Sequence, residues 1–358
     1  MNFTSTIKTL KENHLYRSAR IADDRCVDFC SNDYLGLKNH SKVVEAFKRG
    51  ADKFGVGAGA SHLINGHTAA HQELEEALAD YTGQKKALLF STGYMANIGV
   101  FSALKGELDW VLQDKLNHAS LIDANHLIGL PLQRYLHKNI DSLEKKAGRQ
   151  AGQGLIVTDS IFSMDGDCAD IGEIDKVAKK SNALLMQDDA HGFGVFKADI
   201  PKHSIYMATL GKAAGVAGAF IAGDVDFIDF LVQKSRPYIY TTAIAPALCV
   251  ATLESLELIK KGEQNEKLLS NIAFFQKFSQ SLGLPITKSD SAIQPLVIGN
   301  NKHTLKISQT LLEQGFHVGA IRSPTVARGT ERLRITLNAN HTQTQIEQLL
   351  IQVKYALQ

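Results

Sequence analysis

Short apolar runs alternate with amphipathic stretches between residues 41 and 222, and this alternation constrains the fold more than any other feature of the sequence. The apolar runs predict buried strands at 87–90, 110–112, 155–159, 183–188, 205–210 and 219–222. The amphipathic stretches predict helices at 41–54, 67–81, 94–104, 121–128, 140–146 and 174–181. Such alternation is typical of an α/β domain with a mostly parallel sheet that helices cover on both faces.

The pattern changes after about residue 252. Long helical stretches at 247–261 and 266–282 lead into fewer strands, at 292–298, 317–321 and 333–337, with helices at 304–314 and from 342 onward. We expect a smaller α+β domain there. The predicted division is an N-terminal segment at 1–30, a large domain at 31–252 and a small C-terminal domain at 253–358.

Charge and cysteine usage exclude several classes of protein. Lys and Arg number 39 against 37 Asp and Glu, which is too even for a dedicated nucleic-acid binder. The four cysteines form no CxxC pair, so neither a disulfide framework nor a zinc ribbon is expected, and no metal site is predicted. The N-terminus lacks the apolar core of a signal peptide, and the apolar stretch 213–222 is too short to span a bilayer. A reducing cytoplasm is the expected compartment.

A first candidate site lies at residues 90–95, where a predicted strand ends and a predicted helix begins. Free backbone amides and the helix dipole make such a junction favourable for an anion, and Gly93 allows close backbone approach. Taken alone, these residues favour a plain strand-to-helix turn capped by Ser91 or Thr92 over an anion site.

A second candidate site is the run Asp-Asp-Ala-His-Gly that starts at Asp188, at the end of an apolar strand. Ligands of open α/β sheets bind at that edge, and a carboxylate there can pair with a cationic ring nitrogen. The alternative is a capping role. Two adjacent carboxylates followed by His191 favour a functional site.

The third candidate is Lys212, which stands alone among small and apolar residues in the segment 209–218. A lysine in such surroundings is suited to nucleophilic use, and lysine is the usual residue that forms a Schiff base with a carbonyl cofactor. The alternative is a surface lysine in a glycine-rich turn. A phosphate site, a carboxylate for a ring nitrogen and a Schiff-base lysine are together the parts that hold pyridoxal 5'-phosphate (PLP).

With these motifs the chain resembles the α-oxoamine synthases, a family of PLP-dependent transferases of fold type I, which is the aspartate-aminotransferase-like fold. The resemblance runs from about residue 10 to the end of the chain. The matching stretches are 31–37 (SNDYLGL), 55–59, 71–75, 117–120 (NHAS), 161–167, 209–218, 291–296, 321–326 and 329–334.

The resemblance implies roles for individual residues around the cofactor. Lys212 would hold the cofactor and later remove the α-proton, and Asp188 would keep the pyridine nitrogen protonated. His118 would stack on the ring and also border the substrate, whereas His191 would bond the ring hydroxyl, with Ser163 nearby. The phosphate would be held by the remaining members of the set, which are Gly93, Tyr94, Thr209 and, from the partner of a homodimer, Thr242.

The resemblance also implies a reaction and its substrates. Arg334, assisted by Asn32, would bind the carboxylate of an amino acid, and Thr325 would line the acyl site. The reaction is a decarboxylative condensation with an acyl thioester. The runs Asp-Asp-Ala-His-Gly at 188–192 and Ala-Ile-Gln-Pro-Leu at 292–296 favour L-alanine and a pimeloyl thioester. Sister enzymes that use glycine or serine are the alternative, and a non-catalytic subunit is a third interpretation.

Some features depart from the family pattern or leave alternatives open. The segment 196–204 is short and lacks the Gly-Arg-Gly-Ser run of relatives, which affects the expected substrate entrance. Lys11 and Arg17 both remain candidates for contact with the acyl chain. The lysine pairs at 145–146, 179–180 and 260–261 read as solvated helix faces or, alternatively, as contacts for an acyl-carrier protein.

Overall fold

The computed structural model describes residues 3–19, 21 and 23–358, and these form two compact units. The large unit comprises Leu35–Phe162 and Cys168–Asn265. The small unit comprises the described residues up to Tyr34 together with Ser163–Asp167 and Glu266–Gln358. The domain limits predicted from the sequence, at 30/31 and 252/253, remain predictions.

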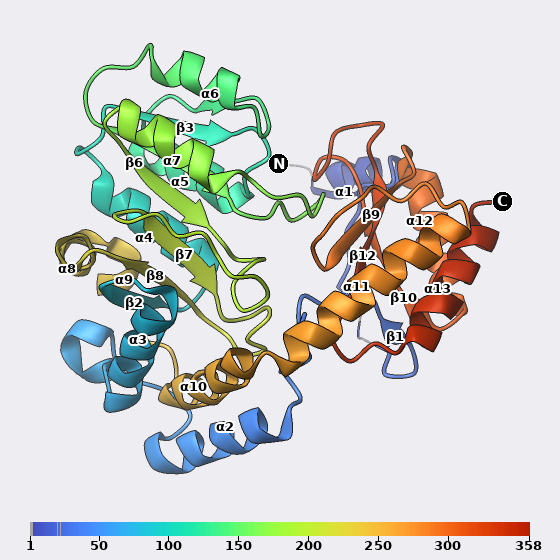
Figure 1. Ribbon diagram of the computed structural model, residues 1–358, viewed down its shortest axis with the longest axis horizontal. Coiled ribbons are helices and arrows are strands. Elements are labelled where there is room, and N and C mark those ends of the chain that lie inside the picture. The colour runs from blue at the N-terminus through green and yellow to red at the C-terminus, as the bar shows by residue number, and fades with distance from the viewer. Residues whose placement is uncertain (1–2, 20, 22) are drawn as a thin grey trace. The chain divides into compact units, whose positions relative to one another are not determined.

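The large unit is built on a seven-stranded sheet in the order β2-β8-β7-β6-β5-β3-β4 (Figure 1). All strands run in the same direction except β8, which is antiparallel to both β2 and β7. The strands are β2 (Lys86–Phe90), β3 (Trp110–Asp114), β4 (Gln133–Tyr135), β5 (Gly154–Asp159), β6 (Ala183–Asp188), β7 (Ile205–Thr209) and β8 (Ala219–Gly223). The expected mostly parallel sheet is confirmed.

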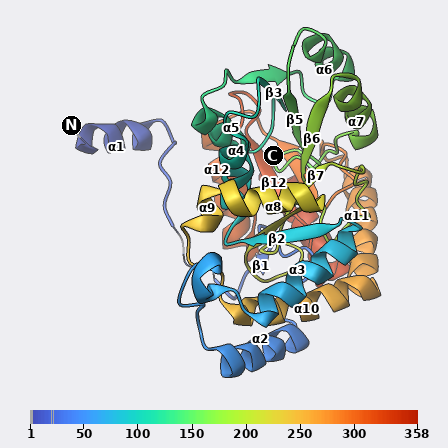
Figure 2. The same ribbon diagram turned by 90° about the vertical axis from the view of Figure 1, so that its left-hand side faces the viewer.

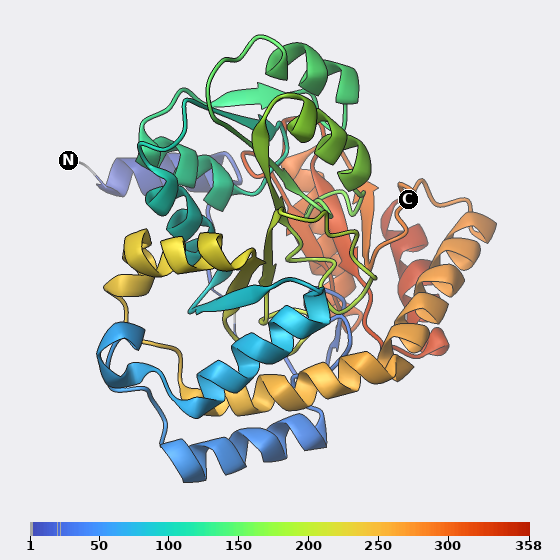
Figure 3. The same ribbon diagram turned by 60° about the vertical axis from the view of Figure 1, so that its left-hand side comes forward.

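Side chains alternate between the two faces of this sheet, because successive residues of a strand point to opposite sides. Val111 and Val157 join a core with one group of helices, whereas Leu112 and Ile156 join a second core with another group. The first group is α4 (Gly93–Leu104), α5 (Ala119–Ile128) and α8 (Val225–Lys234), and the second is α6 (Ile140–Ala147) and α7 (Ile171–Lys180). Figure 3 shows the strands lying between these two groups.

The remaining helices of the large unit gather beside the β2–β8 end of the sheet. α10 (Pro246–Lys261) packs against both α2 (Ser41–Phe54) and α3 (Ala69–Thr82), and the three lie one above another in Figure 2. Gly50 of α2 permits this packing, since a Cβ there would lie 2.7 Å from the backbone of Ala247. Two short turns, η1 (His62–Gly66) and α9 (Arg236–Ile239), pack against each other nearby.

The small unit contains an antiparallel sheet in the order β11-β12-β9 and a parallel pair, β1-β10. Its strands are β1 (Val27–Asp28), β9 (Ile293–Val297), β10 (Phe316–His317), β11 (Gly319–Ile321) and β12 (Arg332–Thr336). Its helices are α1 (Phe3–Glu12), α11 (Glu263–Ser281), which begins within the large unit, α12 (Asn301–Glu313) and α13 (Gln343–Ala356). Among the described residues, no helix combines the length and apolar character needed to cross a bilayer.

A buried carboxyl group completes the hydrogen bonding of β2, which is an edge strand. Glu75 of α3 is buried, and its Oε1 accepts a hydrogen bond of 2.9 Å from the backbone N–H of Leu89. Burial raises the pKa of Glu75 to about 7. The pKa of a glutamate in an unfolded chain is about 4.3. The unfolded chain therefore releases this proton first, and the free energy of unfolding falls as the pH rises from about 4 to about 7.

We predict that Glu75→Gln, which keeps an acceptor for Leu89, raises the melting temperature relative to the wild type more at pH 8.5 than at pH 5. The matched control is Glu76→Gln at the neighbouring exposed position, for which the difference from wild type should be equal at both pH values. Thermal unfolding measured at the two pH values checks this. An equal effect of Glu75→Gln at both would contradict it.

Candidate active site

The residues predicted for the site in the large unit come at or just after the ends of strands that run in one direction. Gly93 comes shortly after β2 and His118 shortly after β3, while Asp188 and Thr209 are the last residues of β6 and β7. Lys212 comes three residues after Thr209. Because strands of one direction end at the same edge of a sheet, these groups share one edge, where ligands of open α/β sheets bind.

Lys212 and His191 are in direct contact. The Lys212 Nζ lies 2.8 Å from His191 Nε2, and both side chains are half-buried. The loop that carries Lys212 closes on itself, since Leu210 N–H and the Thr209 hydroxyl both donate to the carbonyl of Gly218 at 2.9 and 3.0 Å. The lysine is therefore presented by a short, internally bonded loop rather than by a flexible turn.

Gly215 is the residue that allows this loop to pack. Its φ is +69°, and a Cβ at this position would lie 2.4 Å from the backbone N of Lys38 and 2.7 Å from the carbonyl carbon of Leu37. The segment 37–38 thus touches the turn immediately after Lys212. A residue with a side chain fits neither the left-handed backbone nor the space.

The Asp188 carboxylate is buried and oriented by two donors. Asn97 Nδ2 donates to Oδ2 at 2.8 Å, and the backbone N–H of Ala190 donates to Oδ1 at 3.0 Å. Only 5% of the residue is exposed. Hydrogen bonds of this kind favour the charged carboxylate, which suits a partner for a protonated ring nitrogen.

His118 caps α5 and presents its exposed side at the same edge. Its Nδ1 edge is packed, because Ser120 Oγ lies 2.8 Å and the Ser120 backbone N 3.3 Å from Nδ1. The protein packed around this edge removes water from it and lowers the pKa of His118; the charge of Asp188 opposes this effect and that of Lys212 adds to it. The effect of both charges on His118 agrees with the place of the three residues at the same edge of the sheet.

The start of α4 offers backbone donors to an anion, next to the end of β7. The amides of Gly93 and Tyr94 belong to the first turn of the helix, where intrahelical acceptors are lacking, and the Thr92 side chain already caps Met95 N–H at 3.1 Å. A Cβ on Gly93 would lie 3.9 Å from the Cβ of Thr209, so this glycine faces the end of β7. This donor set, with an amine and a carboxylate at the same edge, fits the phosphate, aldehyde and ring nitrogen of PLP.

Asp189 lies next to the site but is turned into the interior. It accepts a hydrogen bond of 2.7 Å from the Tyr206 hydroxyl, and burial raises the pKa of Asp189 to about 7. Gly192 is required beside it, because a Cβ there would lie 2.2 Å from Asp189 Oδ1. Of the two adjacent carboxyls in the sequence motif, Asp188 is therefore the one held by nitrogen donors, whereas Asp189 bonds a tyrosine hydroxyl.

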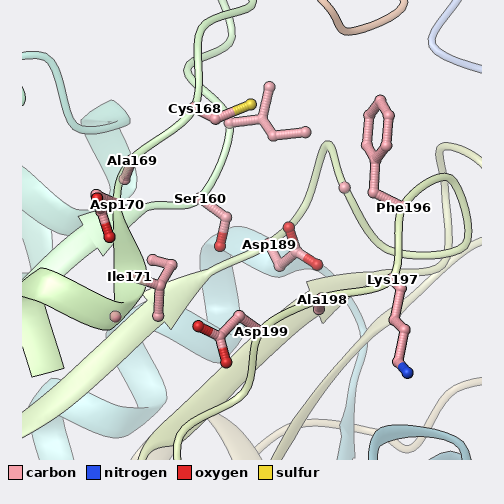
Figure 4. Close-up of a pocket in the computed structure, with 13 residues that line it drawn as sticks. Ser160, Cys168, Ala169, Asp170, Ile171, Asp189, Phe196, Lys197, Ala198 and Asp199 are labelled. Carbon is pink, nitrogen blue, oxygen red and sulfur yellow. The ribbon is translucent and has the colours of Figure 1, made fainter.

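A cavity of about 450 Å³ opens beside Asp189, and Figure 4 shows the side chains in its wall. Ser160 and Asp189 form one part of the wall, and residues 196–199 form another. The segment that the sequence analysis found to be short thus borders a cavity. Lys212 and His118 are not among the described residues that line it, so the cavity is separate from the cluster around Lys212.

The small unit brings together another set of predicted residues. The Arg334 guanidinium donates to the Ser163 carbonyl at 2.6 Å, to Thr336 Oγ1 at 2.9 Å and to Asn32 Oδ1 at 3.1 Å. Arg334 is only 7% exposed. These three partners fix the plane of the guanidinium, which is what recognition of a carboxylate by two parallel hydrogen bonds needs.

The last predicted residues lie on exposed segments. Thr325 is exposed and accepts a hydrogen bond of 2.9 Å from Arg17, whereas Lys11 lies over the ring of Tyr16. Thr242 is exposed and forms an isolated bridge with Ser61 in the large unit. The lysines at 179, 180 and 260 are engaged in ion pairs on helix surfaces.

Sequence reasoning missed two residues that contact the site. Asn97 and Ser120 are fully buried, and both touch predicted members of the cluster. A signal for Asn97 existed, since it is the one amide side chain in the otherwise largely apolar helix α4. Ser120 lay inside the NHAS motif that carried part of the resemblance but was given no role.

Comparisons with known proteins agree with this geometry. Residues 24–353 match the family described as aminotransferase class I and II. The 8-amino-7-oxononanoate synthase of Ectopseudomonas mendocina is 49% identical over 343 residues, which are 92% of this chain and 88% of the relative.

Two solved structures also match this chain over most of its length. A serine palmitoyltransferase variant from S. paucimobilis with bound PLP-myriocin aldimine superposes with a TM-score of 0.90 at 27% identity, over 98% of this chain and 96% of that one. The 8-amino-7-oxononanoate synthase from Francisella tularensis has a TM-score of 0.78 at 30% identity, over 94% of this chain and 98% of that one.

We predict that Gly215→Ala lowers the melting temperature of the cofactor-free protein, because the left-handed backbone alone costs about 1–2 kcal/mol and the new Cβ meets the backbone of Lys38. The matched control is Gly211→Ala in the same loop, where the nearest atom to a Cβ is Thr209 Oγ1 at 3.8 Å. Thermal unfolding of both variants checks this. Equal melting temperatures for the two variants would argue against the packing described here.

Proposed function

The chain belongs to the aminotransferase class I and II family and, within it, to the 8-amino-7-oxononanoate synthases, and from this premise we propose that it condenses L-alanine with a pimeloyl thioester. The products are 8-amino-7-oxononanoate, CO2 and the free thiol, which is a step of biotin biosynthesis. The protein is a PLP-dependent acyltransferase. The observation that carries this proposal is the 2.8 Å contact of Lys212 with His191 at the sheet edge that also holds Asp188, in a chain 49% identical to enzymes of that name.

When bound, PLP supplies an aldehyde that takes up amines and a protonated pyridine ring that accepts electrons from a bond broken at the amino-acid Cα. Lys212 would hold the aldehyde, and its amine would also remove the α-proton of the bound alanine. His191, 2.8 Å from the Lys212 amine, would bond the ring hydroxyl beside it. Asp188, oriented by Asn97 and Ala190, would keep the proton on the ring nitrogen.

The remaining cofactor contacts follow from the same edge of the sheet. His118 would cover one face of the ring with its exposed side, and this role needs no proton transfer. The amides of Gly93 and Tyr94 would hold the phosphate. The hydroxyl of Thr209 would join them by turning its hydrogen from the Gly218 carbonyl to the phosphate. Ser163 is assigned to the cofactor on the resemblance alone.

A homodimer is part of the proposal, with Thr242 of each subunit reaching the phosphate of the other. An exposed apolar surface supports it: Val56, Ile64 and Tyr240 are 91%, 78% and 71% exposed. They lie on segments that the Ser61–Thr242 bridge and the bond from Ala243 N–H to the Ala60 carbonyl join. Apolar side chains gathered in this way mark a surface for another protein.

For the substrates we propose the roles that the resemblance implies. Arg334, with Asn32, would bind the alanine carboxylate, and Thr325 would line the acyl site, with His118 bordering the substrate. Arg17, rather than Lys11, is the proposed contact for the acyl chain, because it is the one that hydrogen-bonds Thr325. The thioester would belong to coenzyme A or to an acyl-carrier protein.

A cytoplasmic location completes the proposal. It is supported by the cysteines at 26, 30, 168 and 249, all of which are free thiols. A reducing compartment keeps thiols in this state.

We predict that the protein loaded with PLP converts L-alanine and a pimeloyl thioester into 8-amino-7-oxononanoate, detected by mass, and that Lys212→Ala abolishes the product. The control is Lys105→Ala at the exposed end of α4, which should retain wild-type turnover. Parallel reactions contain glycine or serine in place of alanine. Turnover with one of these and none with alanine would reject the proposed substrate in favour of a sister activity.

A further inference from the structure

A continuous line of hydrogen bonds joins His118 to Asp188 through two buried residues. His118 Nδ1 lies 2.8 Å from Ser120 Oγ, Ser120 Oγ lies 2.8 Å from Asn97 Nδ2, and the same Nδ2 lies 2.8 Å from Asp188 Oδ2. Asn97 and Ser120 are both 0% exposed. The line crosses from the start of α5 through α4 to the end of β6.

The direction of each bond follows from chemistry, starting at Asp188. An ionised carboxylate can only accept, so the Asn97 atom that faces it must be the amide nitrogen. That nitrogen donates its second hydrogen to Ser120 Oγ. Asn97 occupies one of the two acceptor positions of the serine oxygen, and the serine hydrogen can be donated to His118 Nδ1, the acceptor within reach.

Two further observations agree with this direction. The backbone N–H of Ser120 also points at His118 Nδ1, at 3.3 Å, and a backbone amide can only donate. The Asn97 carbonyl oxygen is buried and has no partner among the described residues. The amide is therefore oriented by the two acceptors of its nitrogen and not by its oxygen.

We propose that Asn97 and Ser120 are positioning residues. They hold His118 as a neutral imidazole with its proton on Nε2, and they connect it by hydrogen bonds to the Asp188 carboxylate. The proposal rests on the proposed function, in which His118 and Asp188 both contact the cofactor. One amide side chain then fixes both the group that covers the ring and the group that pairs with its nitrogen.

Other charges act on His118 and set the background for this effect. Asp188 on β6 and Asp123 on α5 favour the imidazolium, and Lys212 disfavours it. The Asp159 carboxyl at the end of β5 lies 3.4 Å from the His118 backbone N. If Nδ1 carried a proton, the Ser120 N–H would face a donor, and the Ser120 hydroxyl could no longer donate to this ring nitrogen. These hydrogen bonds therefore disfavour the imidazolium, as the charge of Lys212 does.

The first test needs no variant. In cofactor-free protein labelled with ¹⁵N-histidine, we expect the His118 signals, identified by their loss in His118→Gln, to show an unprotonated Nδ1 and a protonated Nε2 at neutral pH. A protonated Nδ1, in either the other tautomer or the imidazolium, would overturn the proposal. This result is independent of turnover, whereas failure of the product assay would count against the proposed function alone.

The second test measures the titration midpoint of His118 in variants. Ser120→Ala and Asn97→Leu should each raise it by about one pH unit, the equivalent of one lost hydrogen bond. Ser120→Thr, which keeps the hydroxyl, should restore the wild-type midpoint. The matched controls are Ser102→Ala on α4 and Asn125→Leu on α5, whose side chains bond only backbone carbonyls.

A purely structural role for Asn97 and Ser120 would lower the melting temperature of the variants and leave the His118 midpoint unchanged. That outcome would overturn the proposal, as would control variants that shift the midpoint equally. Affinity for PLP gives an additional readout. We expect it to fall about tenfold in Asn97→Leu, since Asp188 loses one of its two donors.

Discussion

The structure depends on one constraint, which is that six of the seven strands in the large sheet run in the same direction. Residues that follow these strands are far apart in the chain, from Gly93 to Lys212, and yet they meet at one edge. The exception, β8, is antiparallel and brings the chain back so that Gly218 can close the loop of Lys212. The common direction of the strands and the closed loop at 209–218 together fix the position of Lys212.

The three carboxyl groups at this edge differ in their surroundings. Asp159 and Asp188 are partners in the register of β5 and β6, and Asp189 follows directly. Burial raises the pKa of Asp159 well above its usual value and that of Asp189 to about 7. Asp188 is the one whose oxygens accept from both a side-chain amide and a backbone amide.

Much of the fold was predictable because its core strands are mostly apolar. Strands β5 and β6 were placed within a residue of their observed bounds, since both faces of each are covered. β4 was missed because Gln133 and Arg134 give an edge strand no apolar pattern. α8 was also missed, although its amphipathic sequence follows Asp224 directly.

For the site, residue types and spacing predicted the reactive groups but not the groups that orient them. Lys212 and His191 are in contact in the structure, whereas the roles assigned to them stay predictions. Asn97 could not be linked to Asp188 from sequence, because 91 residues separate them and only tertiary packing of α4 against the sheet brings them to 2.8 Å. Long-range polar contacts of this kind have no local signature.

The central claim is that the Lys212 amine holds the cofactor. Borohydride reduction of the PLP-loaded protein, followed by peptide mapping, tests it most directly. We expect a single labelled peptide, with the cofactor mass on Lys212. A label on any other side chain, or none at all, would contradict the account.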